Sequence, residues 1–250
     1  MFDTTPLKAY YGKIFDIHAH ILGMSAYEMI SYLQAQFNHK ENDIAFDDKD
    51  ALEKAFRLLV SENNETRNDG LTPKNLNLIR DGIGDQLTIA YFLGFKVDGL
   101  KDESFSHITP LVPASYTEYC AQADECVNKL SHALLETNDK ELAQEAYVQL
   151  LANLYNIPEF SRFDPTYDLI DITFSSLSKI CPDMETAEAT LESYKNKGYV
   201  VHIDKVPSGY AIFVSEDCVV NGEAIPKGKF LKSIHKLDPM LTHIDEDTVW

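Results

Sequence analysis

The sequence has few basic residues, and its cysteines are sparse. Its 250 residues include 22 lysine and arginine residues against 40 aspartate and glutamate residues, which gives a formal net charge of −18. A chain this negative gains no affinity from counterion release at phosphates, so nucleic acid is excluded as the expected partner. The four cysteines form no CxxC pair, so we expect free thiols rather than a zinc site or a disulfide.

Long apolar runs are also missing. No stretch approaches the roughly 18 apolar residues of a membrane-spanning helix, and the first residues lack the basic and apolar pattern of a secretory signal. We therefore expect no membrane partner and a cytoplasmic location. What is present, 44% hydrophobic and 11% aromatic residues, is typical of a folded globular chain with a buried core.

Helical patterns dominate the chain from about residue 25 to residue 179. Asp47 or Asp48 can cap a helix that runs to about Glu65, and Thr72-Pro73 predicts the start of the next helix, which continues to about Lys96. Other predicted helices cover residues 27–39, 116–136, 139–155 and 165–180.

The pattern changes after Pro182. A helix is predicted over residues 185–197, where Gly198 ends it, and strands over residues 199–206 and 210–216. Asn221-Gly222 predicts a hairpin turn. The expected fold class is therefore mainly α: a helical bundle in residues 1–180 with a small α+β extension in residues 181–250.

The helical part contains a faint internal similarity. Residues 85–92 can be aligned with residues 148–155, each on the second helix of a helix pair, with Val148 in the place of Asp85. One interpretation is a degenerate internal repeat of residues 27–97 in residues 116–178. Chance similarity between two helical faces is the other interpretation, and the sequence leaves both open.

Four acidic residues fall on two stripes that otherwise contain apolar side chains. The first stripe comprises Ala51, Ala55, Leu58, Glu62 and Glu65. The second comprises Leu78, Asp81, Asp85, Thr88 and Phe92. Helical spacing predicts that each stripe faces the bundle. Because clustered carboxylates repel unless a cation neutralises them, and oxygen ligands favour hard cations, the stripes predict a Mg²⁺ site, with Mn²⁺ as the alternative.

Two glycines interrupt the second of these helices between its aspartates. Gly82 and Gly84 each cost roughly 1 kcal/mol relative to alanine in a helix interior. The cost indicates that something approaches the backbone closely at this point, either a neighbouring helix or a bound phosphate.

Two groups of residues resemble a known family. Residues 61–65 (Ser-Glu-Asn-Asn-Glu) and residues 79–85 (Ile-Arg-Asp-Gly-Ile-Gly-Asp) resemble the MazG-like, all-α nucleoside triphosphate pyrophosphohydrolase superfamily, whose signature is ExxE on one helix and ExxD on the next. Residues 175–179 (Ser-Ser-Leu-Ser-Lys) are similar to the Ser-Asn-x-Ser-Lys segment of phage and bacterial members described as phosphoribosyl-ATP pyrophosphohydrolase-like. The segment Gly228–Ser233 and Pro239 are also similar to that group.

The resemblance implies an enzyme that uses Mg²⁺ to hydrolyse a nucleoside or deoxynucleoside triphosphate to the monophosphate and pyrophosphate. Glu62 and Glu65 match ExxE, and the resemblance makes them both metal ligands and the candidates for the catalytic base. Asp85 matches the aspartate of ExxD, whose glutamate falls on Gly82, so Asp81 is the expected substitute ligand.

The resemblance also implies substrate contacts and a setting. The candidates for binding the substrate are Arg80, Ser178 and Lys179. The expected setting is the cytoplasm of a bacterium or of a phage-infected host. Assembly into a homo-oligomer is left open.

Two alternatives accompany this interpretation. A nucleotide-binding or sensing protein without turnover would share the fold, and Gly82 in place of a glutamate motivates it. His18 and His20 form an HxH pair typical of metal-dependent amidohydrolases, but the (β/α)₈ barrel of that class disagrees with a helical chain. Finally, the basic residues near the C-terminus are either a phosphate-facing edge or, as the pattern favours, a solvated loop and strand; they are Lys227, Lys229, Lys232 and Lys236.

Overall fold

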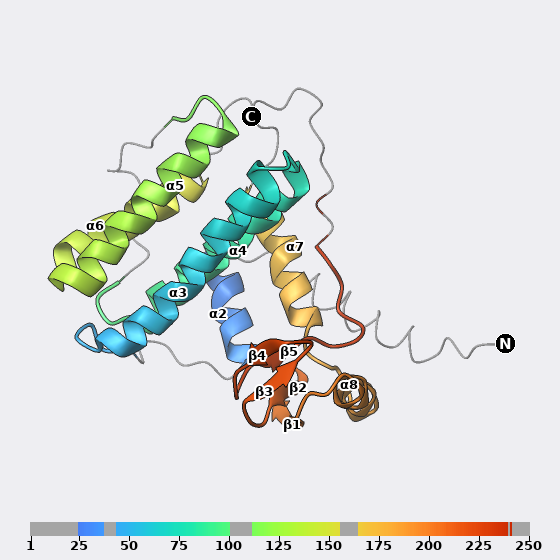
Figure 1. Ribbon diagram of the computed structural model, residues 1–250. Coiled ribbons are helices and arrows are strands. Elements are labelled where there is room, and N and C mark those ends of the chain that lie inside the picture. Colours follow the sequence, from blue (N-terminus) through green and yellow to red (C-terminus); the bar gives the residue numbers. More distant parts are fainter. Residues whose placement is uncertain (1–24, 38–43, 101–111, 156–164, 240, 242–250) are drawn as a thin grey trace. The chain divides into compact units, whose positions relative to one another are not determined.

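The computed structural model describes residues 25–37, 44–100, 112–155, 165–239 and 241, which are mostly helical, with short strands near the C-terminus (Figure 1). This confirms the mainly α fold class with a small α+β extension. The chain divides into two compact units. We call the described residues of 25–31 and 40–172 the helical unit, and residues 32–37 and 173–239 the C-terminal unit. Within the described ranges, none of the helices combines the length and apolar character needed to cross a membrane.

The first hairpin of the helical unit consists of α3 (Lys49–Glu65), the π-helix η1 (Thr66–Leu71) and α4 (Leu76–Lys96). Asp48 caps α3 as predicted, because its carboxylate accepts a hydrogen bond from the backbone N–H of Ala51. The predicted start of α4 at Thr72-Pro73 is wrong. Lys74 has a positive φ of 58°, which interrupts the helix, and Asn75 caps α4 instead.

The second hairpin consists of α5 (Tyr116–Ser131), the π-helix η3 (His132–Thr137) and α6 (Lys140–Tyr155). Ser115 caps α5 by accepting a hydrogen bond from Glu118 N–H, and the Glu118 carboxylate accepts one from Ala114 N–H in return. Asn138, with a left-handed φ of 53°, ends the π-helix. The two hairpins therefore share one order of elements.

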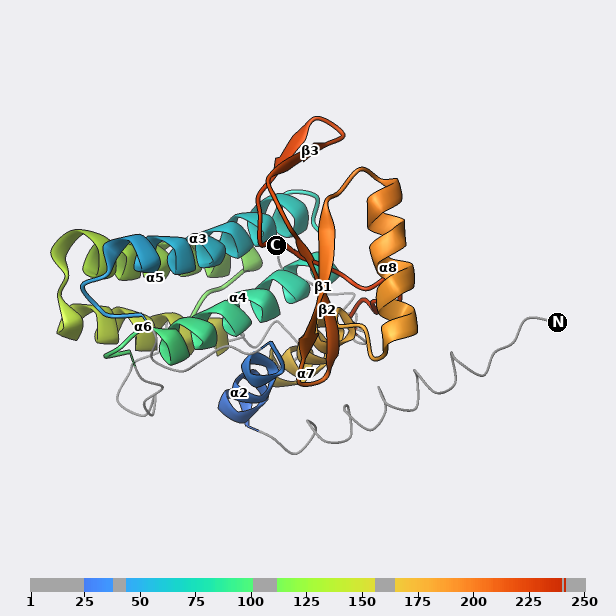
Figure 2. The same ribbon diagram turned by 90° about the horizontal axis from the view of Figure 1, so that it is seen from below.

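These four α-helices form a bundle. Within each hairpin the two helices pack against each other, and α3 also packs on α5 while α4 packs on α6 (Figure 2). Apolar side chains that are fully or almost fully buried fill the core; they include Leu52, Leu59, Ile83, Leu87, Leu130, Tyr147 and Leu151. The buried Tyr119 hydroxyl donates a hydrogen bond to the Leu154 carbonyl at 2.8 Å, which ties α5 to α6.

Two further helices extend from the helical unit into the C-terminal unit. They are α2 (Ala26–Gln36) and α7 (Pro165–Ser178), and each crosses the boundary between the units within its own length. The last turns of α7 therefore belong to the same unit as the strands that follow it.

The C-terminal unit combines α8 (Met184–Asn196) with two antiparallel sheets. The three-stranded sheet has the order β1 (Val201–Val206), β2 (Gly209–Val214), β5 (Phe230–Leu231), and the smaller sheet pairs β3 (Cys218–Val220) with β4 (Glu223–Ile225). As predicted, Asn221 and Gly222 make the β3–β4 turn, and both have positive φ values, 52° and 86°.

Each face of the three-stranded sheet carries a small apolar cluster. On one face, Ile212 and Val214 pack with Ala187 of α8, which lies beside β1 and β2 (Figure 2). On the other face, Phe213 packs with Phe230 and Phe37. Alternate residues of β2 thus serve two small cores, which is the period of two expected of a strand.

Candidate functional site

The structure separates the two glutamates of ExxE. The buried side of α3 consists of Leu52, Ala55, Phe56, Leu59 and Asn63. Glu62 lies at the edge of this side and is half-buried, whereas Glu65 is exposed, and so is Leu58 at 47%. The predicted stripe is therefore wrong for Leu58 and Glu65, because the buried face lies one residue further along the helix.

The two aspartates of the second stripe lie on the rim of the bundle. Asp81 and Asp85 are both half-buried, Thr88 is buried, and Leu78 at the start of the stripe is 42% exposed. The second stripe is thus partly confirmed, since its apolar beginning faces solvent. Glu62, Asp81 and Asp85 remain as acids at intermediate depth on two helices that pack together.

Thr66 fixes the two helices against each other at these acids. Its hydroxyl donates a hydrogen bond to the Glu62 carbonyl and accepts one from Gln86 Nε2, both at 2.8 Å. A Cβ at Gly82 would overlap the same hydroxyl. Gly82 and Gln86 lie on either side of Asp85 in the sequence. Their contacts with Thr66 therefore hold this part of α4 close to the turn that follows Glu62.

The close approach accounts for both glycines without a ligand. Thr66 occupies the space beside Gly82, and the Ile172 side chain of α7 occupies the space beside Gly84. Of the two causes predicted for these glycines, the neighbouring helix is therefore confirmed. A glutamate at position 82, as in ExxD, would require Thr66 to move, because this place is filled by protein atoms.

Arg80 forms a buried ion pair. Its guanidinium donates to both carboxylate oxygens of Asp168 on α7, at 2.8 Å from Nε and 2.5 Å from Nη2, and the two side chains are only 3% and 4% exposed. A bidentate pair at this depth joins α4 to α7 one residue before Asp81. The ion pair gives Arg80 a structural role, because it joins two helices. The contact of Arg80 with the substrate stays a prediction.

A third polar contact was not predicted from the sequence. Asp124 of α5 accepts a hydrogen bond from Asn63 of α3 and forms an ion pair with Arg67 of η1. Asn63 is therefore buried because it has a carboxylate partner 61 residues away. The signal in the sequence is that Asp124 lies on the buried side of α5, four residues after Cys120 and three before Val127.

The donor set limits what the acids can hold. Among the residues that the structure describes, no three His, Cys, Asp or Glu side chains come together as a metal-holding group. Mg²⁺ commonly uses one or two carboxylates and completes its shell with water and substrate phosphates. Asp81 and Asp85, four residues apart on one helical face, fit that smaller requirement.

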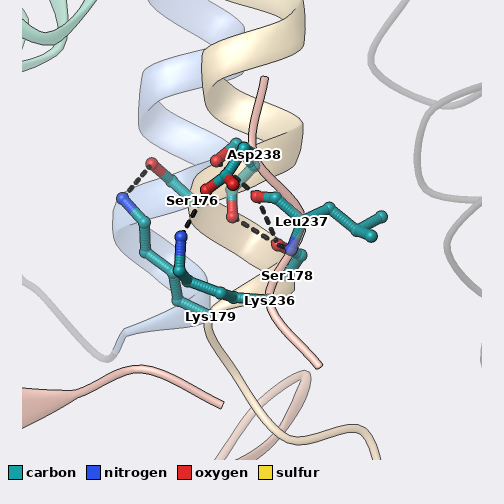
Figure 3. A network of polar contacts seen from close by, with 7 residues as sticks. Ser176, Ser178, Lys179, Lys236, Leu237 and Asp238 are labelled. Atoms are coloured by element: carbon teal, nitrogen blue, oxygen red, sulfur yellow. Dashed lines mark hydrogen bonds and ion pairs between the residues drawn. The ribbon is translucent and has the colours of Figure 1, made fainter. Parts of the chain in front are cut away.

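Serines at the end of α7 form a second polar network, in the C-terminal unit (Figure 3). Ser175 Oγ donates to the Leu237 carbonyl at 2.9 Å, and Ser178 Oγ accepts from Leu237 N–H at 2.8 Å. Ser178 also donates to the Ser175 carbonyl at 2.6 Å. These bonds account for Ser178 as a structural residue, and its contact with substrate stays a prediction.

Lys179 lies on the outer side of this network. It is half-buried, and its Nζ donates to Ser176 Oγ at 3.3 Å (Figure 3). Ser175 and Ser178 thus bond to the backbone of Leu237, whereas Ser176 and Lys179 form a separate pair. His18 and His20, the residues of the amidohydrolase alternative, lie outside the described residues.

The comparisons with known proteins identify no family. No protein-family model, curated protein or solved structure matches the chain.

Proposed function

We propose that the chain is a Mg²⁺-dependent pyrophosphohydrolase that converts a nucleoside or deoxynucleoside triphosphate to the monophosphate and pyrophosphate. The observation that carries the proposal is the contact at Thr66, which packs the turn after the half-buried Glu62 against the part of α4 that carries Asp81 and Asp85. Asp81 and Asp85 lie four residues apart on one face of α4, where like charges repel, and a bound cation would offset that repulsion.

The residues have distinct parts in this proposal. Asp81 and Asp85 would hold Mg²⁺, with Mn²⁺ as the alternative, and the bound ion neutralises the triphosphate charge. Glu62, on the facing helix, would accept the proton of the attacking water. Glu65 is exposed, so we expect it to contribute less than the resemblance implies.

A second candidate is a nucleotide-binding protein without turnover. It is favoured by Gly82, which carries no carboxylate and whose side-chain space is filled by Thr66. Such a protein would bind a Mg²⁺–nucleotide complex through Asp81 and Asp85 and release no pyrophosphate. The cytoplasmic location and a homo-oligomeric assembly stay predictions.

Turnover of a nucleotide panel separates these candidates. The full chain is incubated with Mg²⁺ and each ribo- and deoxynucleoside triphosphate, and the monophosphate and pyrophosphate are both measured. Glu62→Gln is the test variant, and Glu53→Gln is the matched control because Glu53 is an exposed acid on the same helix that pairs with Arg57 in the i, i+4 position.

We expect at least one nucleotide to yield equal amounts of monophosphate and pyrophosphate. Glu62→Gln should lower kcat about 100-fold, the usual contribution of a positioned base, and Glu53→Gln should leave kcat unchanged. Binding of nucleotide without any turnover would favour the second candidate. Equal activity in Glu62→Gln and the wild type would remove Glu62 from the mechanism.

A further inference from the structure

Three polar side chains lie on one face of the three-stranded sheet in the C-terminal unit. β1 and β2 lie side by side (Figure 2), and their antiparallel pairing places His202 opposite Phe213. Side chains alternate between the two faces of a strand, so Asp204 shares the face of His202. Ser215 follows β2 directly, and its N–H extends the pairing by donating to the Val200 carbonyl at 2.8 Å. The register of the two strands therefore brings a serine, a histidine and an aspartate together.

His202 contacts both of the other polar side chains. Its Nδ1 lies 2.9 Å from Ser215 Oγ, and its Nε2 lies 3.5 Å from the Asp204 carboxylate. The imidazole also lies beside the ring of Phe213, with 6.1 Å between the ring centroids and 33° between the ring planes. Phe213 in turn packs against Phe230, with 5.7 Å between the centroids. The packed aromatic rings therefore help to hold the imidazole where it meets both partners.

The carboxylate of Asp204 determines where the imidazole carries its proton. An ionised carboxylate only accepts hydrogen bonds, so the neutral ring has its N–H at Nε2, toward Asp204. Nδ1 then presents a lone pair, and the Ser215 hydroxyl donates a hydrogen bond to it. A serine that donates to a histidine, which is itself oriented by a third group, is the arrangement of an activated nucleophile.

Solvent reaches all three side chains. Those of His202 and Asp204 are 46% and 57% exposed, and Ser215 is half-buried. A substrate can therefore approach the serine hydroxyl directly. The expected substrate is an ester rather than an amide, because an alkoxide or phenoxide is a better leaving group than an amine.

We propose that Ser215 accepts an acyl group from a small carboxylic ester, with His202 as its base. Oγ forms a bond to the carbonyl carbon of the ester while its proton passes to His202 Nδ1. The bond from that carbon to the alcohol oxygen then breaks, and His202 returns the proton to the departing oxygen. The products are acylated Ser215 and an alcohol. Asp204 is a positioning residue, since it keeps the Nε2 proton toward itself and stabilises the transient imidazolium.

Acetylation of the full chain by p-nitrophenyl acetate tests the proposal. Mass spectrometry of peptides from timed samples locates each acetyl group and gives its rate of formation. Ser193 of α8 is the control within the same sample, because it is a half-buried serine of the same unit. The test variants are Ser215→Ala, His202→Gln, Asp204→Asn and Asp204→Glu.

We expect Ser215 to be acetylated about 100-fold faster than Ser193, the usual contribution of a positioned base, and His202→Gln to remove the difference. Asp204→Asn should lower the rate at Ser215 about ten-fold, and Asp204→Glu should restore most of it, because the carboxylate and not the size of the side chain orients the imidazole. Equal rates at Ser215 and Ser193, or an unchanged rate at Ser215 in His202→Gln, would overturn the proposal.

The proposal is independent of the proposed function, and two variants keep them apart. Glu62→Gln should lose nucleotide turnover and keep the acetylation of Ser215. Ser215→Ala should lose this acetylation and keep nucleotide turnover. Loss of both activities in Ser215→Ala would contradict a separate acyl-accepting site.

Discussion

The first and second hairpins of the helical unit each consist of an α-helix, a six-residue π-helix and a second α-helix. In each, a threonine hydroxyl bonds to the carbonyl five residues earlier, Thr72 to Arg67 and Thr137 to His132. Matching these threonines puts Val127 and Leu130 in the positions of Glu62 and Glu65, and both are buried. At these positions the second hairpin is apolar where the first is acidic.

The second helices of the two hairpins differ in the same way. Aligning Asp85 with Val148 puts Gly82 opposite Glu145, so each hairpin keeps one acid of an ExxD pair. Val148 is 2% exposed, Asp85 is half-buried and Glu145 is exposed. The second hairpin shows that the order of α-helix, π-helix and α-helix forms without carboxylates at its buried positions. A helix pair of this kind therefore does not require acids at these positions in order to fold.

The largest expected effect comes from the ion pair that distinguishes the first hairpin. Arg80 pairs with Asp168, whereas the aligned residue of the second hairpin is the buried Ala143. Asp168→Ala leaves a buried guanidinium without its carboxylate and should lower the free energy of unfolding by about 3–5 kcal/mol in urea titrations. Arg80→Met/Asp168→Leu should recover most of this loss of stability. If it does not, the ion pair contributes more to stability than the mutual neutralisation of its two buried charges.

Exchanging the residues at the aligned positions tests the comparison directly. Val148→Asp buries a carboxylate among apolar side chains and should cost about 3 kcal/mol. Asp85→Val should change the unfolding free energy by less than about 1 kcal/mol, because Asp85 is only half-buried. Urea unfolding measures both variants. Equal destabilisation by the two changes would mean that the hairpins do not differ as described.

A smaller effect is expected in the first hairpin where Gly82 of α4 approaches Thr66 of η1. Gly82→Ala places a methyl group against the Thr66 hydroxyl, and the overlap outweighs the gain in helix propensity. The unfolding free energy should fall by about 1–2 kcal/mol. In a double-mutant cycle, Thr66→Ala should relieve part of this loss. Additive losses would show that another neighbour makes the contact.

The smallest effect is the pH dependence that the thiols of α5 contribute, since only α5 carries cysteines within the two hairpins. Burial raises the pKa of Cys120 and of Cys126 to about 11. Because the unfolded thiols ionise near pH 9, the unfolded state loses protons first and stability falls as the pH rises from 9 to 11. The loss from these thiols should be about 1 kcal/mol per thiol at pH 10, and Cys120→Ala/Cys126→Ala should remove it, while the loss from the buried Tyr119 and Cys181, whose pKa values burial also raises, remains.

Local signals in the sequence predicted much of the fold. Asp48 as a cap, Gly198 as a helix end and the Asn221-Gly222 turn all depend on neighbouring residues, and the structure confirms them. The predicted face of α3 is displaced by one residue from the buried face, which ends at Asn63, a polar residue whose side chain bonds to Asp124 of another helix. No local pattern contains such a partner.

The candidate site shows the same division. Helical spacing predicted that Asp81 and Asp85 share a face, but the role of Arg80 depends on a carboxylate 88 residues away. Likewise, Ser175 and Ser178 of the Ser-Ser-Leu-Ser-Lys segment bond to the backbone of Leu237, whereas the buried Ser176 pairs with Lys179, because a segment 59 residues after Ser178 lies against the end of α7. The residue types are the basis of the predicted metal and phosphate chemistry. Long-range contacts decide which of these side chains have a structural role instead.

Binding of Mn²⁺ as a substitute for Mg²⁺ tests most directly whether the first hairpin alone is functional. Electron paramagnetic resonance measures bound Mn²⁺ in the presence of a non-hydrolysable nucleoside triphosphate, in the wild type, in Asp85→Asn and in Glu125→Gln. Glu125 is an exposed acid of the second hairpin that pairs with Lys129. We predict that Asp85→Asn loses the bound Mn²⁺ and that Glu125→Gln keeps it. Retention of Mn²⁺ by Asp85→Asn, or an equal loss in both variants, would contradict the account.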